Sequence, residues 1–340
     1  MNHSETAISD VVGYFGPNTV TWQLYREPVF VLGGVRALLL QIAHPAVADG
    51  VARYSNFQAD PFGRGYRTFA AMAMIYFGDK KQADATAQRL WRIHSAVQGH
   101  YQISDLGFQS ADSPTPQSSI PNPHPEASGP IPYSANNPDL LLWVLATLTD
   151  ITLQVYQRIP FGNLPSDWRE RFYEESKITA RLFGIPDEVY PPDLQAFQIY
   201  FEKMLNSDLL GSTPTCRQMA QAIVRHPRAP KKLAALFAAG WMPKLLCQRL
   251  GIEAGPEPEI RLEKWLRGFG RFYRLLPVWL RRNPAYHQAK YRIAKAEGKS
   301  PTWAGWFFNW LGRRVKVPLG LEHIKILPPS PPSSHPNTPQ

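Results

Sequence analysis

The chain has 340 residues, of which 44% are hydrophobic and 12% aromatic, so it can bury a sizeable core, and disorder is excluded for most of its length. Its two cysteines, Cys216 and Cys247, exclude a disulfide framework and a cysteine-rich metal site, and they fit a reducing compartment. No zinc or aromatic recognition motif accompanies the net charge of +10, so we expect no nucleic-acid partner.

The N-terminal part of the chain predicts helices, because its apolar residues recur at helical spacing. Residues 1–10 are polar and lack a basic stretch followed by an apolar core, so we expect a cytoplasmic protein without a secretory signal. Residues 29–51 predict a long core helix that starts at Pro28 and is kinked or broken by Pro45. They are too polar to predict a membrane span. Further helices are expected at residues 64–77 and 81–98.

Residues 104–138 are rich in Pro, Ser and Asn and predict a long surface loop. Helical spacing resumes after it, and Asn137 is a suitable N-cap for the next helix. Apolar and polar residues do not alternate over any sustained stretch, so strands are not expected and the predicted fold class is all-α. The helices expected in this part cover residues 138–158, 166–183, 192–206, 215–224, 230–248, 259–273 and 283–297.

The basic excess lies in the C-terminal third of the chain. Residues 217–317 hold 21 Lys and Arg against 5 Asp and Glu, a balance of +16, whereas the remainder holds 16 basic and 22 acidic residues, a balance of −6. Residues 303–310 add three tryptophans and two phenylalanines. This composition fits either a packed aromatic element with a solvated basic face or peripheral contact with an anionic membrane.

The expected division of the chain follows these changes in composition. It consists of an N-terminal segment (1–20), a helical domain (21–255) that includes the loop 104–137, a basic aromatic helical region (256–326), and a disordered Pro/Ser-rich tail (327–340).

The first candidate for chemistry is the segment from Gly33-Gly34 to His44-Pro45. Its glycines and alanines allow close packing against a neighbouring helix or a flat cofactor. His44 precedes a proline, where the backbone leaves helical angles. A histidine held by a hydrogen bond at the kink is the simpler interpretation, and cofactor binding by His44 is the alternative.

The second candidate opens the helix that follows the turn at residues 60–63. Arg64 and Thr68 are one helical turn apart, and Arg67 lies beside them. Two cations and a hydroxyl at a helix N-terminus suit an anionic group, such as a haem propionate, or dioxygen. Considered alone, the same residues fit a solvated basic helix start better.

The third candidate is His94. Leu90, Ile93 and Val97 form an apolar face at helical spacing, and His94 borders that face. A neutral imidazole in an apolar pocket is what haem iron needs from a proximal ligand, although a lone histidine on such a face is more often structural. The sequence lacks nucleophile-elbow, phosphate-loop, dinucleotide-binding, zinc and di-iron motifs. A cofactor bound in a helical pocket is therefore still an open interpretation, but the spacing of the residues does not by itself point to one.

A longer series of motifs runs in order through the chain. It comprises Trp22 with Arg26-Glu27-Pro28, Gly33-Gly34, His44-Pro45, Asp60-Pro61-Phe62-Gly63-Arg64, Arg67-Thr68, His94 with Val97 and Gly99, Leu142-Trp143-Val144, Ala146-Thr147, and Tyr173-Glu174. In this series the sequence resembles the MpaB-type oxygenases, which share a catalytic domain with the bacterial latex-clearing proteins (rubber oxygenases). The resemblance covers residues 21–205.

The resemblance implies a globin-like helical core around haem b, with additional C-terminal helices and with His94 as the axial ligand of the iron. The rubber oxygenases carry an arginine, a lysine and a threonine on the distal side, and Arg64, Arg67 and Thr68 correspond to them. An arginine stays protonated, so we expect it not to ligate the iron, which would be five-coordinate or water-bound. Leu145 stands where the family has a histidine, and the loop after His94 is longer than expected.

The function expected from this resemblance is that of a haem b-dependent oxygenase acting with dioxygen on an apolar, unsaturated or lipid-like substrate. Arg64 and Thr68 would be catalytic by hydrogen-bonding dioxygen, whereas His94, Arg67 and His44 would bind the cofactor. Two alternatives remain open: a non-catalytic haem-binding sensor or carrier, and a membrane-surface interaction protein that docks through its basic C-terminal third.

Overall fold

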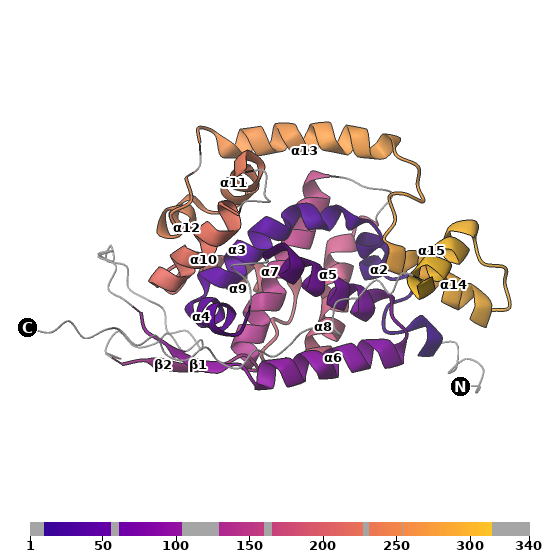
Figure 1. The fold of residues 1–340 in the computed structure, drawn as a ribbon, viewed down its shortest axis with the longest axis horizontal. Coiled ribbons are helices and arrows are strands. Elements are labelled where there is room, and N and C mark those ends of the chain that lie inside the picture. The colour runs from indigo at the N-terminus through magenta and orange to yellow at the C-terminus, as the bar shows by residue number, and fades with distance from the viewer. Residues whose placement is uncertain are drawn as a thin grey trace, which may run out of the picture.

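The structure is a computed structural model that describes residues 10–55, 61–103, 129–159, 165–226, 231–253 and 255–314. Most of these residues lie in helices (Figure 1). The predicted all-α fold class is confirmed, because the described chain contains fifteen helices and one two-stranded sheet. Most of the predicted loop, residues 104–128, and the predicted disordered tail, residues 327–340, lie outside the described residues.

Polar N-caps fix where several of the helices begin. Asp79 and Gln82 form a capping box, and the side chain of Asn137 accepts the backbone N–H of Asp139 at 2.8 Å, as predicted. The helices are α2 (Val20–Tyr25), the 3-10 helix η1 (Pro28–Gly33), α3 (Gly34–Ala43), α4 (Pro45–Tyr54), α5 (Pro61–Phe77), α6 (Lys80–Ser95), α7 (Pro138–Arg158), α8 (Trp168–Leu182), α9 (Leu194–Leu205), α10 (Pro214–Val224), α11 (Lys231–Ala239), α12 (Lys244–Arg249), α13 (Pro258–Leu275), α14 (Pro284–Ala296) and α15 (Trp303–Arg314).

The predicted break at Pro45 is present. The stretch Pro28–Ala43 and the helix Pro45–Tyr54 meet at 101°. Pro45 occupies the first position of α4, where its missing N–H is harmless, but it cannot continue α3. The first part of the predicted helix is the 3-10 helix η1 rather than α-helix. The break turns α4 away from the axis of α3 and leaves His44 at the corner.

The helix α7 lies at the centre of the fold and is crossed by η1 and α3 (Figure 1). The crossing is close, because a Cβ atom at Gly33 would lie 1.9 Å from Cγ1 of Ile151. A buried ion pair between Arg36 and Asp150 joins α3 to α7. Of the described helices, α7 is long and apolar enough to cross a membrane, as is the bent pair around Pro45, and 67% of the α7 window is buried inside the protein. That burial is typical of a core helix.

The C-terminal helices are attached to the N-terminal part through the end of α2. Glu27 and Arg282 form an ion pair, and the backbone N–H of Asn283 donates to the carbonyl of Arg26 at 2.8 Å. In Figure 1, α13 runs along one edge of the molecule, and α14 and α15 lie side by side beyond its C-terminal end. These contacts hold the segment between α13 and α14 against the helical core.

The expectation that strands are absent is wrong. The strands β1 (Gln98–Tyr101) and β2 (Ile131–Ser134) pair antiparallel, with Gly99 opposite Tyr133. A side chain at Gly99 would not fit, because its Cβ would lie 2.7 Å from the Tyr133 hydroxyl. Strands of four residues are too short to show an alternating pattern in the sequence. The β2 strand therefore occupies residues that were expected to belong to the loop.

The remaining differences between the predicted and the observed elements concern where helices are interrupted and which helices were missed. Residues 230–248 were expected to form one helix but form α11 and α12, because Gly240 and Pro243 interrupt the helical path. The helices α2 and α15 were not among those expected. Both are rich in aromatic residues, which are weaker helix formers than alanine or leucine, and α2 spans only six residues.

Candidate functional site

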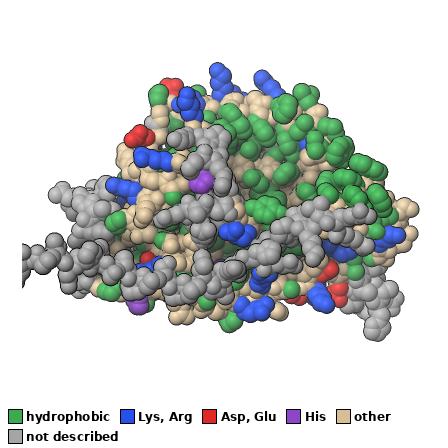
Figure 2. Space-filling view, in the orientation of Figure 1, with side chains coloured by type: hydrophobic (Ala, Val, Ile, Leu, Met, Phe, Trp, Pro, Cys, Tyr) green, Lys and Arg blue, Asp and Glu red, His purple; other side chains and the backbone are tan. Residues whose placement is uncertain are grey.

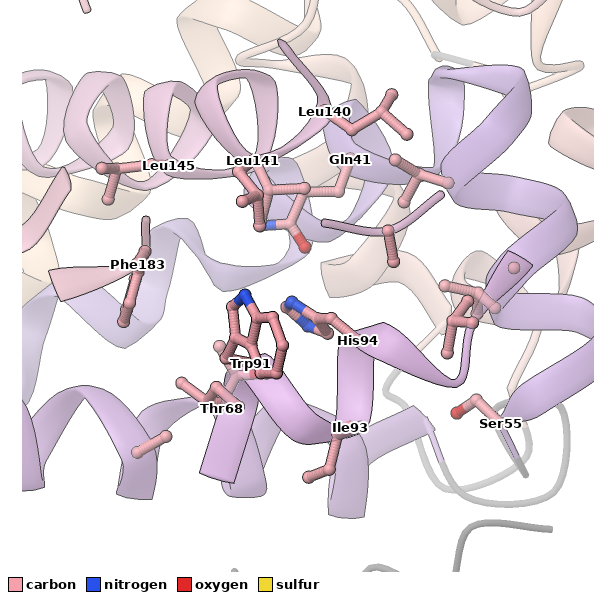
Figure 3. A pocket seen from close by; sticks show the side chains of 18 of the residues that line it. Gln41, Ser55, Thr68, Trp91, Ile93, His94, Leu140, Leu141, Leu145 and Phe183 are labelled. Atoms are coloured by element: carbon pink, nitrogen blue, oxygen red, sulfur yellow. The ribbon is translucent and has the colours of Figure 1, made fainter. Parts of the chain in front are cut away.

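A cavity of about 580 Å³ lies between the α4 and α7 walls and the α5–α6 pair (Figure 3). Its size is within the range of about 300–1,000 Å³ that is usual for small-molecule and cofactor sites. Most of the lining is apolar and includes Val144, Leu145, Leu148 and Phe183. An apolar lining of this kind binds a flat hydrophobic group or an apolar substrate by removing both from water.

His94 lies in the last turn of α6 and contributes to the cavity wall. Its imidazole and the indole of Trp91 point into the cavity side by side (Figure 3). The start of α6 is fixed by the capping box, and Ala87, two turns before His94, is buried and lines the same cavity. Trp91 is 57% exposed, so this part of the wall lies where the cavity meets solvent.

Arg67 and Thr68 line the same cavity from α5. Thr68 and Trp91 are both among the lining residues labelled in the close-up view (Figure 3). The structure therefore brings together three of the five predicted site residues: His94, Arg67 and Thr68. Arg64 belongs to α5, one turn before Thr68, but its side chain lies outside the described residues. Its predicted catalytic role stays a prediction.

His44 is not part of the cavity lining. Its Nδ1 accepts the backbone N–H of Ala46 at 3.2 Å and thereby caps α4, and its ring lies edge-on to Tyr101. Burial disfavours the charged imidazolium and lowers the pKa of His44 to about 4. The geometry matches the hydrogen-bonded histidine at a kink. Cofactor binding by His44 stays a prediction that this position does not favour.

Gln41 is a polar cavity residue that was not among the predicted site residues. Its amide lies on the wall opposite His94 and faces the cavity (Figure 3). The Nε2 atom donates to the Thr147 hydroxyl at 3.1 Å, and this hydroxyl donates to the carbonyl of Val144 at 2.7 Å. One signal was available in the sequence, because Gln41 is the single uncharged polar residue in the apolar run from Ala37 to Ala43.

Tyr133 is another polar residue of the wall, and its hydroxyl is held by a side chain outside the lining. The Tyr133 hydroxyl donates to Asp49 at 2.8 Å, and Asp49 also pairs with Arg53. Burial and the neighbouring carboxylate raise the pKa of Tyr133 above its ordinary value. Among the described residues, no three His, Cys, Asp or Glu side chains gather as a metal site.

These features define a helical domain built around an apolar cofactor or ligand cavity. The chain belongs to the family described as "ER-bound oxygenase mpaB/B'/Rubber oxygenase, catalytic domain", whose match covers residues 22–275. The resemblance inferred from the sequence motifs is thereby confirmed. The match also extends the domain beyond residue 205 to the end of α13.

Two similar proteins come from mycobacteria and are described only as uncharacterised. The protein from Mycobacterium bovis and that from Mycobacterium tuberculosis are each 30% identical to this chain over 173 residues, which is 50% of this chain and 57% of the relative. The chain thus spans little more than half the length of the curated relatives it matches. No solved structure matches the chain at a significant level.

Proposed function

We propose that this protein is a haem b-dependent oxygenase that acts with dioxygen on an apolar, unsaturated or lipid-like substrate. The observation that supports the proposal best is the placement of His94 in the wall of an apolar cavity within an oxygenase-family domain. The cavity has the size of a cofactor site. A single imidazole on an otherwise apolar wall is the donor that haem iron takes from a protein.

The residues of the cavity fit a haem in three respects. His94 would hold the iron, since it is the only histidine in the described lining. The Arg67 guanidinium would pair with a propionate carboxylate, because arginine forms charge-assisted hydrogen bonds with such groups. Other apolar residues of α7, among them Leu141 and Val144, would cover the porphyrin face.

Haem iron, when bound, supplies the activation of dioxygen. The remaining tasks fall to side chains of the chain. Thr68 and Arg64 would hydrogen-bond dioxygen and stabilise negative charge that develops on it. Leu145 and Phe183 would bind the apolar substrate and exclude water. Because leucine occupies the position of the family histidine, this part of the wall offers no proton donor or acceptor of its own.

The test is the absorption spectrum of the purified protein, as isolated and after reconstitution with haemin. We expect a strong haem band that is lost or shifted in His94→Ala. His100→Ala is the matched control, because His100 is an exposed residue of β1 outside the cavity lining, and it should keep the wild-type spectrum. A wild-type protein without a haem band after reconstitution would refute the proposal.

A second measurement separates an oxygenase from a haem-binding sensor or carrier. The reconstituted protein is supplied with a polyisoprene or an unsaturated lipid, and dioxygen uptake and oxidised products are measured. We expect uptake by the wild type and strongly reduced uptake by Arg64→Ala, with the haem band retained. A haem spectrum without dioxygen uptake on any such substrate would favour the sensor or carrier.

A further inference from the structure

Large apolar side chains gather on the surface where α13 ends and leads into α14. Leu275 is 82% exposed, and the other members of this C-terminal apolar face are also exposed. Figure 2 shows hydrophobic side chains massed over this part of the molecule, next to arginines and lysines along α13. The face consists of Phe272, Leu275, Val278, Trp279, Leu280 and Trp303.

The face is continuous from α13 to α15. The rings of Trp279 and Trp303 meet edge to face, with their centroids 5.9 Å apart. Trp303 in turn stacks on Phe307 of the same helix. Trp306 and Trp310 are exposed and stack on one another along α15. Contiguous exposed apolar surface of this kind indicates an interaction site, because a soluble surface otherwise scatters such residues singly.

Hydrogen bonds hold the backbone beneath the face in place. The Tyr273 hydroxyl donates to the carbonyl of Arg281 at 3.0 Å, and Nε2 of His287 lies 3.0 Å from the carbonyl of Trp279. The ion pair between Arg282 and Glu27 anchors the end of the segment to the N-terminal half. The exposed side chains are therefore presented by a fixed backbone, so that little ordering is needed on binding.

The charge around the face has one sign. Residues 264–296 contain nine Lys and Arg and no Asp or Glu. Lys264, Arg267 and Arg271 are exposed on α13 and lie one helical turn apart. A helix that carries aromatic and leucine side chains beside a row of arginines has the composition of elements that lie in the interface of an anionic bilayer.

We propose that the C-terminal apolar face docks this protein on the surface of a membrane that contains anionic lipids. The apolar side chains enter the boundary between headgroups and acyl chains, and the tryptophans settle at the level of the headgroups. The arginines of α13 bind the lipid phosphates. A second copy of the chain is a less suitable occupant, because pairing two such faces would bring the arginine rows of both copies together. This proposal does not depend on haem.

The experiment is co-sedimentation of the full chain with vesicles. One set consists of phosphatidylcholine alone, and the other is an equimolar mixture of phosphatidylcholine and phosphatidylglycerol. We expect the protein to pellet with the mixed vesicles, to bind less as salt is added, and to stay in the supernatant with phosphatidylcholine alone. The tryptophan emission should shift to shorter wavelength on binding.

Two double variants test the two parts of the face. Leu275→Ser with Leu280→Ser should lower the partition coefficient by about a hundredfold, because each leucine no longer gains from leaving water. Arg267→Gln with Arg271→Gln should lower it by about thirtyfold on the mixed vesicles. The control is Ile199→Ser with Lys203→Gln, an exposed apolar–basic pair on α9, which should bind as the wild type does.

Three results would overturn the proposal. The first is a wild-type protein that stays in the supernatant with the mixed vesicles. The second is wild-type binding by both double variants. The third is a concentration-dependent dimer of the wild type that the leucine variant abolishes, which would assign the face to self-association. Circular dichroism and thermal unfolding check that each variant is folded, and all substituted positions are exposed.

Discussion

Gln41 Nε2 donates to the Thr147 hydroxyl across 3.1 Å, and both residues are buried. The bond joins α3 to α7 at the wall of the cavity. Because the nitrogen side of the amide is occupied by Thr147, its oxygen is turned toward the cavity and His94 (Figure 3). The pair thus fixes the orientation of a polar group that faces the predicted cofactor ligand.

Replacing both members of this pair should destabilise the fold less than the sum of the two single replacements. Thr147→Val leaves the Gln41 amide without its acceptor, and we expect the free energy of unfolding to fall by about 1–3 kcal/mol. Gln41→Leu combined with Thr147→Val removes both polar partners, so the double variant should be destabilised less than the sum of the single variants. Urea denaturation of the four proteins measures this coupling. Additive effects would show that the bond contributes nothing of its own.

Gly33 and Gly34 are adjacent, but they should respond differently to alanine. A Cβ at Gly33 would collide with Ile151 on α7, whereas a Cβ at Gly34 has no neighbour within 4 Å. We expect Gly33→Ala to lower the free energy of unfolding by about 1–3 kcal/mol through overpacking. Gly34→Ala should be neutral or stabilising by up to about 1 kcal/mol, because alanine favours the helix. Thermal unfolding of both variants decides the matter, and equal effects would contradict the close crossing of η1 with α7.

The neutral form of His44 should make stability depend on pH. Its pKa is about 4 in the folded protein and about 6.5 in the unfolded chain, so between pH 6.5 and 4 the unfolded chain takes up the proton but the folded protein does not. This contribution is therefore present in full above pH 6.5 and is lost as the pH falls from 6.5 to 4. The loss amounts to about 3 kcal/mol. Protonation would also remove the acceptor that caps α4 and place a cation at its N-terminus.

His44→Asn is the variant that isolates this effect. Asparagine is a good N-cap but does not titrate, so the free energy of unfolding of the variant should change less between neutral pH and the acid end of that window. Chemical denaturation of wild type and variant at both pH values provides the measurement. Parallel losses in the two proteins would assign the acid sensitivity to other groups.

In the proposed haem site, Arg67 should contribute to haem affinity without controlling the axial ligand. Arg67→Gln removes one charge-assisted hydrogen bond to a carboxylate, and we expect the haem dissociation constant to rise by about tenfold or more. Arg92→Gln is the matched control, because Arg92 is exposed on α6, near His94, and outside the cavity lining. Transfer of haem to an acceptor protein measures the affinity. Equal affinities of the two variants would remove Arg67 from the cofactor site.

The sequence predicts helix boundaries well where a single residue, such as a proline or an N-cap, marks them. Pro45 predicts the break, and Asn137 predicts the start of α7, since the effects of proline and of an N-cap act within one helical turn. The interruption of residues 230–248 was missed, although Gly240 and Pro243 lie within them. The pairing of β1 with β2 joins segments some thirty residues apart, which no local pattern reveals.

The candidate site was predicted in part, and its limits have physical reasons. The resemblance identified His94, Arg67 and Thr68, and the fold brings all three to one cavity. The two interpretations of His44 could not be separated by sequence, because they differ only in which atoms surround the ring. Gln41 was missed because its hydrogen bond to Thr147 depends on the crossing of α3 and α7, which is a property of the tertiary fold.

The small sheet has a consequence for how the length of the chain beside the cavity can vary. Because β1 and β2 run antiparallel, Tyr101 and Ile131 are paired, and the chain between them leaves and returns at one place beside the cavity. Closing a longer connection between fixed ends adds only about 0.6 kcal/mol for each doubling of its length. A longer or shorter connection between the strands therefore leaves the spacing of the cavity walls unchanged. The paired strands thus separate the geometry of the cavity from the length of the chain that joins them.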